Sequence, residues 1–458
     1  MIRFRWPLMA AFVLLSGCIN LAPTYERPQA EVAEQWLPGT SVPKGQAPAD
    51  IKWQQFFTDS RLSQLQALAL SNNRDLRVAT LNIEKAQAQY RIQRAAAFPG
   101  IDASVTGTQS HTSGTTSHDY SAQLGLSSYE LDLFGRVQNL EDEALEAYLS
   151  LAETRRSTQI SLVAEVGTAW LTLAADNERL KLAQETLISQ QATYDLTQRS
   201  HGLGGSSGLA VSEAQTTVES ARVDIGVYAS QVLQDQNALR LLVGSEIPTQ
   251  LLPGDSLQSV AMLVQVPGQL PSTLLQRRPD VLAAEHTLKS ANIDIGAARA
   301  AFFPSITLTA SAGSASSSLS SLFKAGSGAW SFAPSISLPI FDAGSNQATL
   351  DSAKVEREIE VQTYQKTLET AFSEVADALA VRSTLDQRLT AQQALTDASQ
   401  KSYELSEALY RGGSQSYLEA LVTQRSLYSA QQDLITLRLA EQSNRVTLYK
   451  VLGGGWNL

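Results

Sequence analysis

The chain of 458 residues has a single cysteine and four histidines, so it offers few side chains for a metal site. One cysteine forms no internal disulfide and no cysteine-rich metal centre. His111 and His118 lie in one Ser/Thr/Gly-rich stretch, SHTSGTTSH, next to Asp119. We expect this stretch to be a solvated loop, and we predict neither a metal nor a cofactor.

Clustered positive charge and long apolar runs are also missing. The net charge is -10 and no run of Lys or Arg occurs, which argues against a nucleic-acid surface. No stretch of about 18 uninterrupted apolar residues is present, so no transmembrane helix is expected. Hydrophobic residues nevertheless make up 43% of the chain, which predicts a folded protein with a large core.

The N-terminus, MIRFRWPLMAAFVLLSGC, has the features of a bacterial export signal. Arg3 and Arg5 precede a short apolar run, residues 8–15, that is too short to span a membrane. The run ends in LSGC, which resembles a lipobox, so we predict a signal peptide over residues 1–17 and a covalent lipid on Cys18. Because Ile19 follows instead of Asp, the inner-membrane retention signal of lipoproteins is absent, and outer-membrane sorting is implied.

Proline is absent from two long segments. None occurs between Pro99 and Pro248 or after Pro339, and Ala/Leu/Gln/Glu-rich runs predict helices over about 137–200 and 346–410. Each helix would extend roughly 95 Å. Apolar residues at 3/4 spacing in the second run predict coiled-coil packing. They are Leu368, Phe372, Val375 and Leu379, with Ala371 and Ala378 beside them.

The two halves of the sequence repeat each other. DLRVATLNIEKAQAQYRIQRAAAFP (75–99) matches DVLAAEHTLKSANIDIGAARAAFFP (280–304), and YDLTQRSHGLGG (194–205) matches YELSEALYRGG (403–413). Each half therefore contains a helix, two strands, a very long helix, a turn and a helix, one unit used twice. The predicted segments after the signal peptide are an N-terminal arm (18–55), the first repeat (56–247), a linker (248–270), the second repeat (271–453) and a tail (454–458).

The predicted strands alternate apolar and small polar residues, as in YSAQLGLS (120–127), SITLTASAGS (305–314) and AWSFAPSISLPIF (329–341). This pattern fits a half-buried soluble strand and an outer-membrane barrel strand equally, and the export signal favours the barrel. Four strands cannot close a barrel, and lipid does not tolerate open edges, so several chains must share one. Three chains would give 12 strands.

The chain resembles the outer-membrane factors, the TolC-like channels, and most closely the lipid-anchored members that serve RND multidrug pumps. The residues that carry the resemblance are LSGC at Cys18, YELDLFGR (129–136), LLQRRPDVLAAEH (274–286), IGAARAAFFPSITL (295–308) and LYKVLGGGW (448–456). The resemblance implies a mixed α/β membrane protein. It would be a homotrimer, with a 12-stranded outer-membrane β-barrel continued by an α-helical coiled-coil tunnel in the periplasm.

The resemblance also implies a function. The trimer would be the passive exit duct of a tripartite efflux system for antibiotics, dyes and other small amphiphiles. Its partners would be a periplasmic adaptor, an inner-membrane RND transporter and outer-membrane lipid, with no nucleic acid. The adaptor would contact the helix tips at Gly204, Gly205, Ser206, Gly412, Gly413 and Ser414.

An iris-like gate is expected next to the second tip, at Tyr410, Tyr417, Leu418, Glu419 and Val422. In the register of the family, the three copies of Leu418 would form an apolar ring and the three copies of Glu419 a carboxylate ring. The alternative for Glu419 is a solvated charge on a helix face. Val422 stands where the family commonly has a second aspartate. Tyr410 is either a packed aromatic or a latch whose hydroxyl bonds a neighbouring coil.

Three other functions fit part of the sequence. Type I protein secretion would use the same fold, whereas a coiled-coil lipoprotein without a pore leaves the alternating strands unexplained. A hydrolase is suggested by G-x-S-x-G at residues 204–208, but a long helix precedes this motif and the downstream His286 lies in a helical repeat. We therefore expect no enzyme activity.

Overall fold

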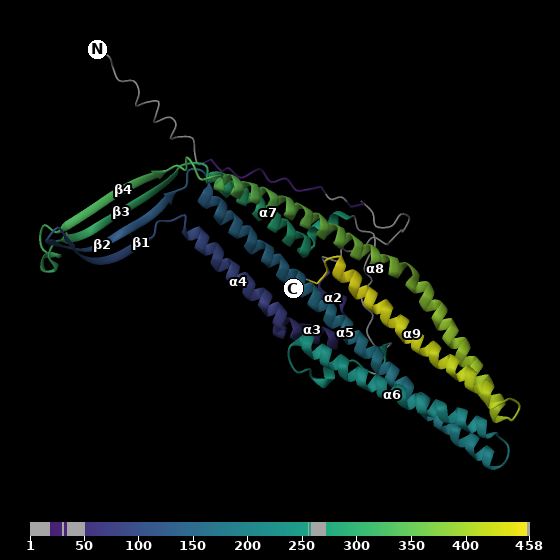
Figure 1. The fold of residues 1–458 in the computed structure, drawn as a ribbon. Helices are drawn as coiled ribbons and strands as arrows, with labels where there is room; N and C mark the ends of the chain where they lie inside the picture. The colour runs from purple at the N-terminus through teal and green to yellow at the C-terminus, as the bar shows by residue number, and fades with distance from the viewer. Residues whose placement is uncertain (1–18, 30–31, 34–50, 255, 258–271, 456–458) are drawn as a thin grey trace. The chain divides into compact units, whose positions relative to one another are not determined.

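The computed structural model describes residues 19–29, 32–33, 51–254, 256–257 and 272–455 (Figure 1). The predicted signal peptide, the lipidation site Cys18 and parts of the predicted arm, linker and tail lie outside the described residues. The chain divides into two compact units. Unit 1 comprises Met1–Ala30, Leu81–Glu153 and Leu282–Thr367, and unit 2 comprises Glu31–Thr80, Thr154–Val281 and Leu368–Leu458.

Long helices dominate both halves of the described chain. The first half contains α4 (Arg74–Ala95), β1 (Ile101–Thr112), β2 (Thr115–Leu131), α5 (Arg136–Gly202) and α6 (Gly208–Val243). The second contains α7 (Pro279–Ala300), β3 (Ser305–Ser316), β4 (Gly328–Ser337), α8 (Ser345–Arg411) and α9 (Tyr417–Val451). The shorter elements are α2 (Trp53–Phe56), α3 (Ser60–Asn72), η2 (Thr249–Leu251), η4 (Ser272–Arg277) and η5 (Leu319–Ser321).

Helices α5 and α8 contain 67 residues each, which corresponds to about 100 Å. Their ends lie within two residues of the predicted ends, so both predictions are confirmed. None of the helices in the described part of the chain combines the length and apolar character that crossing a membrane requires.

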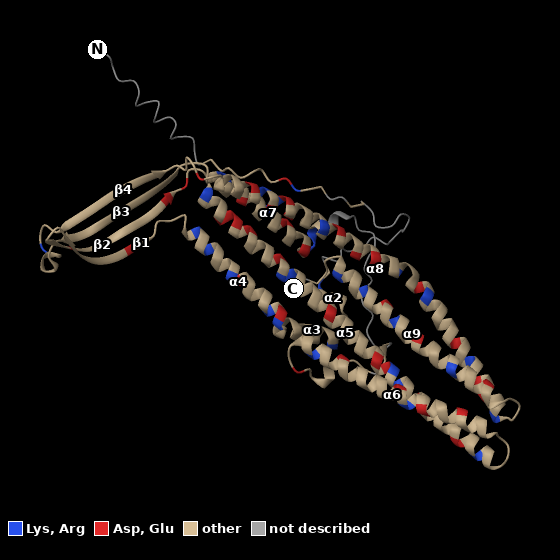
Figure 2. Cartoon of the chain, in the orientation of Figure 1, with Lys and Arg blue, Asp and Glu red and all other residues tan. Residues whose placement is uncertain are grey.

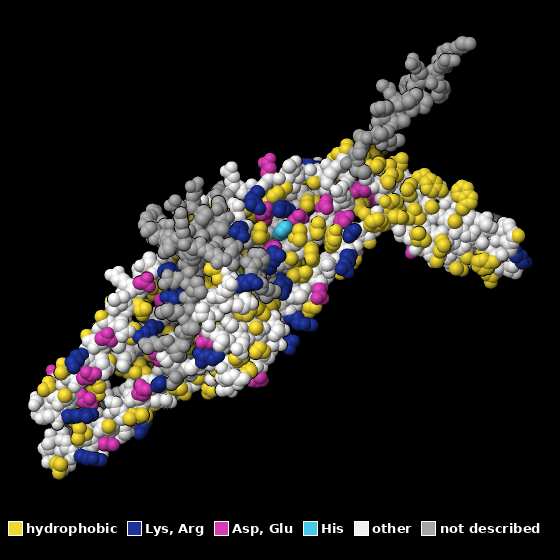
Figure 3. All heavy atoms as spheres, turned by 180° about the vertical axis from the view of Figure 1, so that it is seen from behind, with side chains coloured by type: hydrophobic (Ala, Val, Ile, Leu, Met, Phe, Trp, Pro, Cys, Tyr) yellow, Lys and Arg dark blue, Asp and Glu magenta, His cyan; other side chains and the backbone are white. Residues whose placement is uncertain are grey.

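The strands of unit 1 form one antiparallel sheet in the order β1-β2-β3-β4, with β1 and β4 at its edges. The register aligns apolar residues in rows across all four strands. One row is Ala103, Leu124, Ala312 and Trp330, and the next is Ile101, Leu126, Ala310 and Phe332. The strands carry few charged residues (Figure 2), and hydrophobic side chains gather over the sheet (Figure 3). With Trp330 81% exposed, this apolar face has no cover within the described chain.

The stretch SHTSGTTSH is a β-hairpin, so the predicted loop is wrong. Ser113 and Gly114 form the turn with φ of 52° and 83°, and Gln109 pairs with His118 across it. Strand preference depends on cross-strand partners, which the small polar residues of this stretch do not reveal. His111 Nδ1 and Thr116 Oγ1 share a hydrogen bond of 2.9 Å. The residues that the structure describes contain no group of three or more potential metal ligands.

The core of unit 2 surrounds the middle of α5 and the end of α9. The ring of Phe56 stacks on Tyr449 at 4.0 Å, and the Tyr449 hydroxyl donates to the Ile51 carbonyl at 2.6 Å. Trp170 is fully buried and donates its ring N–H to the Leu251 carbonyl at 3.0 Å. These contacts join α2 to α9 and η2 to α5.

The coiled-coil seam of α8 in unit 2 differs slightly from the predicted one. Leu368, Ala371, Val375 and Ala378 are buried, whereas Phe372 and Leu379 are half-buried. The alanines thus occupy the seam, since their small side chains let a neighbouring helix approach closely.

Candidate functional site

The predicted adaptor-contacting residues lie in the two turns that join α5 to α6 and α8 to α9. Both turns have the same backbone structure. Gly204 and Gly413 have φ of 76° and 72°, in the left-handed region that glycine adopts without strain. Gly413 N–H donates to the Tyr410 carbonyl at 3.0 Å, and Ser414 N–H donates to the Leu409 carbonyl at 2.9 Å. This is a Schellman motif.

The first turn repeats this hydrogen-bond pattern. Gly204 N–H donates to the His201 carbonyl at 2.9 Å, and Gly205 N–H donates to the Ser200 carbonyl at 2.8 Å. Ser206 Oγ adds a bond of 2.8 Å to Ser200 Oγ. The structure therefore brings Gly204, Gly205 and Ser206 together in one turn, and Gly412, Gly413 and Ser414 in the other.

Two predicted gate residues, Tyr410 and Tyr417, lie in a packed cluster beside the second turn. Tyr417 is 6% exposed and is buried with Leu421 of α9 and Ala214 of α6, and Tyr410 packs against this cluster. The Tyr410 and Tyr417 rings lie 5.5 Å apart. Burial raises the pKa of the Tyr417 phenol, which therefore stays neutral at physiological pH.

Hydroxyl groups connect α8 to α5 near this cluster. Tyr410 and the fully buried Thr197 share a hydrogen bond of 2.9 Å, and Tyr403 and Ser189 share one of 3.2 Å. Tyr410 therefore has both contacts that the sequence left open, a packed ring and a hydroxyl bonded to a neighbouring coil. Its role as a latch stays a prediction.

The other three predicted gate residues lie on the exposed face of α9. Leu418 is 55% exposed and Val422 is 54% exposed, one helical turn apart, and Glu419 is exposed between them. The structure thus separates an inner pair, Tyr410 and Tyr417, from an exposed group of two apolar residues and one carboxylate. Their part in a gate stays a prediction.

Sequence reasoning missed an ionic cluster between α5, α6 and α9. Asp176 is 4% exposed and accepts from Arg179 Nη1 at 2.5 Å. Arg179 Nη2 also donates to Thr436 Oγ1 of α9 at 2.9 Å. Burial and a hydrogen bond with Asp176 raise the pKa of the Asp235 carboxyl to about 6. The available signal in the sequence was the presence of Asp176, Arg179 and Asp235 in helices that are otherwise rich in Ala, Leu and Gln.

Another missed contact joins α9 to α6. The Tyr428 hydroxyl donates to Asp224 Oδ2 at 3.0 Å. Tyr403 and Tyr410 are seven residues apart on α8, a heptad spacing that marks one face of a coiled-coil helix. That spacing was the signal for the contacts of these two tyrosines with α5.

Comparison with known proteins identifies the family. The model of the "Outer membrane efflux protein" family matches residues 65–245 and 270–454, one match in each half. Two relatives from Pseudomonas putida, the antibiotic efflux pump outer membrane protein ArpC and the toluene efflux pump outer membrane protein TtgC, are each 50% identical over 461 residues. Both alignments cover 98% of this chain and 94% of the relative.

A solved structure agrees with these matches. The open state of the MtrE outer membrane channel from Neisseria gonorrhoeae has a TM-score of 0.89 and 37% sequence identity. The alignment covers 96% of this chain and 99% of that channel. The chain therefore belongs to the outer membrane efflux protein family, a family of transport proteins.

Proposed function

We propose that three copies of this outer membrane efflux protein form the passive exit duct of a tripartite efflux assembly. The observation that carries the proposal is the sheet of unit 1, with its exposed apolar face and its open edges at β1 and β4. In lipid, unpaired backbone groups at an edge each cost several kcal/mol, so each edge must pair with another copy. Three copies give 12 strands, which is within the range of known barrels.

The cargo follows from the named relatives. ArpC is named for antibiotic efflux and TtgC for toluene efflux, which supports small organic compounds, from antibiotics to apolar solvents, as cargo. The same names favour efflux over type I protein secretion. An inner-membrane RND transporter would supply the energy, and a periplasmic adaptor would contact the two glycine turns.

The exposed group of Leu418, Glu419 and Val422 supports a closed gate at the α8–α9 turn. Around a three-fold axis it would form two apolar rings and one carboxylate ring. Three nearby carboxylates repel one another, so such a ring attracts cations and is held closed by the apolar contacts on either side. Tyr410 and Tyr417 would then hold α8 and α9 against α5 and α6.

Planar-bilayer recording of the purified protein tests the duct. Discrete channels support the proposal, and repeated absence of channels from folded trimer contradicts it. Deletion of the gene should also increase susceptibility to dyes, detergents and antibiotics.

Two substitutions test the gate. Leu418→Ala and Glu419→Ala should each raise the resting conductance and the sensitivity of cells to vancomycin. The first removes apolar contact from the closed ring, and the second removes the carboxylates through which bound cations link the three copies. Unchanged values in both variants would remove these residues from the gate.

We also propose that Cys18 carries a lipid. Ile19, the residue after Cys18, donates its backbone N–H to the Leu133 carbonyl at 3.2 Å, two residues beyond the end of β2. Asn292 and Arg299 of α7 donate to the carbonyls of Pro23 and Leu21 at 2.8 and 2.9 Å. The start of the mature chain is thus bound beside the ends of the strands, where a lipid anchor reaches the membrane.

A further inference from the structure

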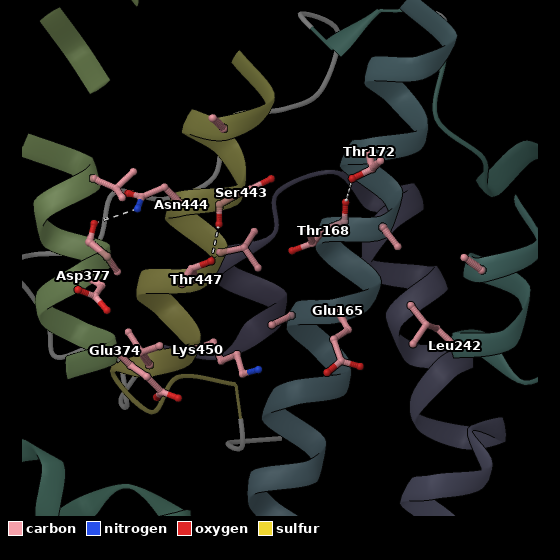
Figure 4. A pocket seen from close by; sticks show the side chains of 18 of the residues that line it. Glu165, Thr168, Thr172, Leu242, Glu374, Asp377, Ser443, Asn444, Thr447 and Lys450 are labelled. Atoms are coloured by element: carbon pink, nitrogen blue, oxygen red, sulfur yellow. Dashed lines mark hydrogen bonds between the residues drawn. The ribbon is translucent and has the colours of Figure 1, made fainter. Parts of the chain in front are cut away.

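Unit 2 contains a cavity of about 890 Å³ between the helix pairs α5/α6 and α8/α9 (Figure 4). Small and apolar side chains form much of its wall, among them Leu242, Ala378, Val381 and Val446. A volume of this size lies within the range of roughly 300–1,000 Å³ that is typical of sites for drug-sized ligands. Because one chain supplies all four helices, the cavity exists without a second copy.

The charged residues of this cavity are mostly acidic. Glu165 of α5, Asp235 of α6 and Glu374 and Asp377 of α8 line it, against one cation, Lys450 of α9. Glu165 and Lys450 extend into the space between α5 and α9 in Figure 4, and Glu374 and Asp377 lie on α8, on the other side of α9 in this view. Glu374 is already paired, because Arg278 Nη2 donates to it at 2.8 Å. Glu165 and Asp377 are exposed.

We propose that this cavity is a binding site for amphiphilic organic cations. The apolar body would lie on the alanine, valine and leucine side chains, and the positive group would lie beside one of the two exposed carboxylates, Glu165 or Asp377. A neutral hydrocarbon would gain nothing from the carboxylates, and an anion would be repelled by them. The inference rests on the proposed efflux function and adds a cargo class and a place where it is held.

A matched pair of probes separates charge from shape. Tetraphenylphosphonium and tetraphenylborate carry the same four phenyl rings around opposite charges. Binding to full-length protein in detergent should be measured by equilibrium dialysis against protein-free micelles. We expect saturable binding of the phosphonium, about tenfold tighter than the borate, that weakens as salt screens the carboxylates.

Variants locate the site. Glu165→Gln combined with Asp377→Asn should weaken phosphonium binding about fivefold, since each half-solvated ion pair contributes modestly. Lys450→Met should strengthen it about twofold, because a repelling charge is removed. Asp386→Asn is the control, since Asp386 is an exposed carboxylate of the same helix that does not line the cavity.

Three results would overturn the inference: equal affinity for both probes, no phosphonium binding, or an unchanged affinity in the double variant. If a neighbouring copy fills the cavity, the phosphonium will not bind and the double variant will instead change the thermal stability of the trimer. Bilayer conductance of the same preparation separates the two proposals. Channels without phosphonium binding refute the site alone, whereas absence of channels refutes the duct.

Discussion

At the scale of single residues, side-chain hydroxyls and carboxylates connect the helices near the α8–α9 turn. Tyr410 bonds Thr197 on α5, and Tyr428 bonds Asp224 on α6. A bond between neutral groups contributes only about 0.5–1.5 kcal/mol, and one to a carboxylate about 1.5–3 kcal/mol. A small number of bonds of this size suits a gate that must both stay shut and open, because opening then costs only a few kcal/mol.

Tyr410→Phe should destabilise the protein by about 1 kcal/mol and raise resting conductance, since the bond to Thr197 is lost. Thr197→Val should have a similar effect on conductance. The double variant should be little worse than either, because both changes remove the same bond. Denaturant unfolding and bilayer recording measure the two effects.

Tyr403→Phe is the matched control, because it removes a similar hydroxyl bond of 3.2 Å, to Ser189, two turns farther from the tip. It should cost similar stability and leave conductance unchanged. A conductance increase equal to that of Tyr410→Phe would show that any loosening of α8 opens the channel, and Tyr410 would then not be a latch.

Asp235 should make stability depend on pH. Its carboxyl has a pKa raised from 3.8 to about 6, so the folded state binds the proton more tightly than the unfolded state. The contribution of Asp235 to stability is therefore greatest below about pH 4 and is lost as pH rises through about 6. Asp235→Asn should remove this slope and stabilise the protein at pH 7.5 by about 1 kcal/mol, a value reduced for solvent screening at a half-buried site.

Thermal unfolding at pH 4, 5, 6 and 7.5 measures the slope, with Asp386→Asn as the exposed control. Parallel curves for the native protein and Asp235→Asn would show that the Asp176–Asp235 contact does not hold a proton in the folded state.

At the scale of elements, the two helix turns reach the same backbone structure from different sequences. Residues 202–207 are GLGGSS and residues 411–416 are RGGSQS, yet Gly204 and Gly413 take the same left-handed position. Gly413→Ala should cost about 1 kcal/mol, because alanine is strained at this φ. It should also weaken adaptor binding, as the end of α8 loses its cap.

Gly202→Ala, at the end of α5 beside the first turn, is the control. Gly202 is helical, and no atom lies within 4 Å of the place that an alanine methyl group would take, so alanine there should stabilise by about 0.5 kcal/mol. Calorimetry should show stability changes of opposite sign in the two variants, and adaptor binding should fall only in Gly413→Ala. Equal losses in both would mean that bulk at the tip, and not backbone strain, matters.

The sequence predicted elements well where local signals are strong. The ends of α5 and α8 came within two residues, since the helices lack proline and end at glycine turns. Strand β1 was not located, because IDASVTGTQSHT becomes a strand only through its pairing with β2. In the candidate site, the burial of Tyr417 beside exposed Leu418 depends on how α9 packs on α6, which one sequence does not reveal.

At the scale of the whole molecule, attachment to the membrane would have two sources, the sheet and the lipid on Cys18. The N-terminal segment 19–29 is bound along α7 by Arg27, which donates to both carboxylate oxygens of Glu285 at 3.0 and 2.7 Å. Against the opposing effect of burial, Arg27 and Lys289 hold the pKa of Glu285 below its ordinary value. Glu285 therefore stays ionised and paired with Arg27 at neutral pH.

Cys18→Ser, exported with a cleavable signal, should lose the lipid and still reach the outer membrane and restore drug resistance. The apolar face of 12 pooled strands buries far more surface than one lipidated residue. Membrane fractionation, lipid labelling and susceptibility measure the outcome. Arg27→Ala added to this variant tests whether the N-terminal segment matters by itself. If Cys18→Ser alone leaves the protein soluble in the periplasm, the lipid is needed for insertion, and the sheet is not the main anchor.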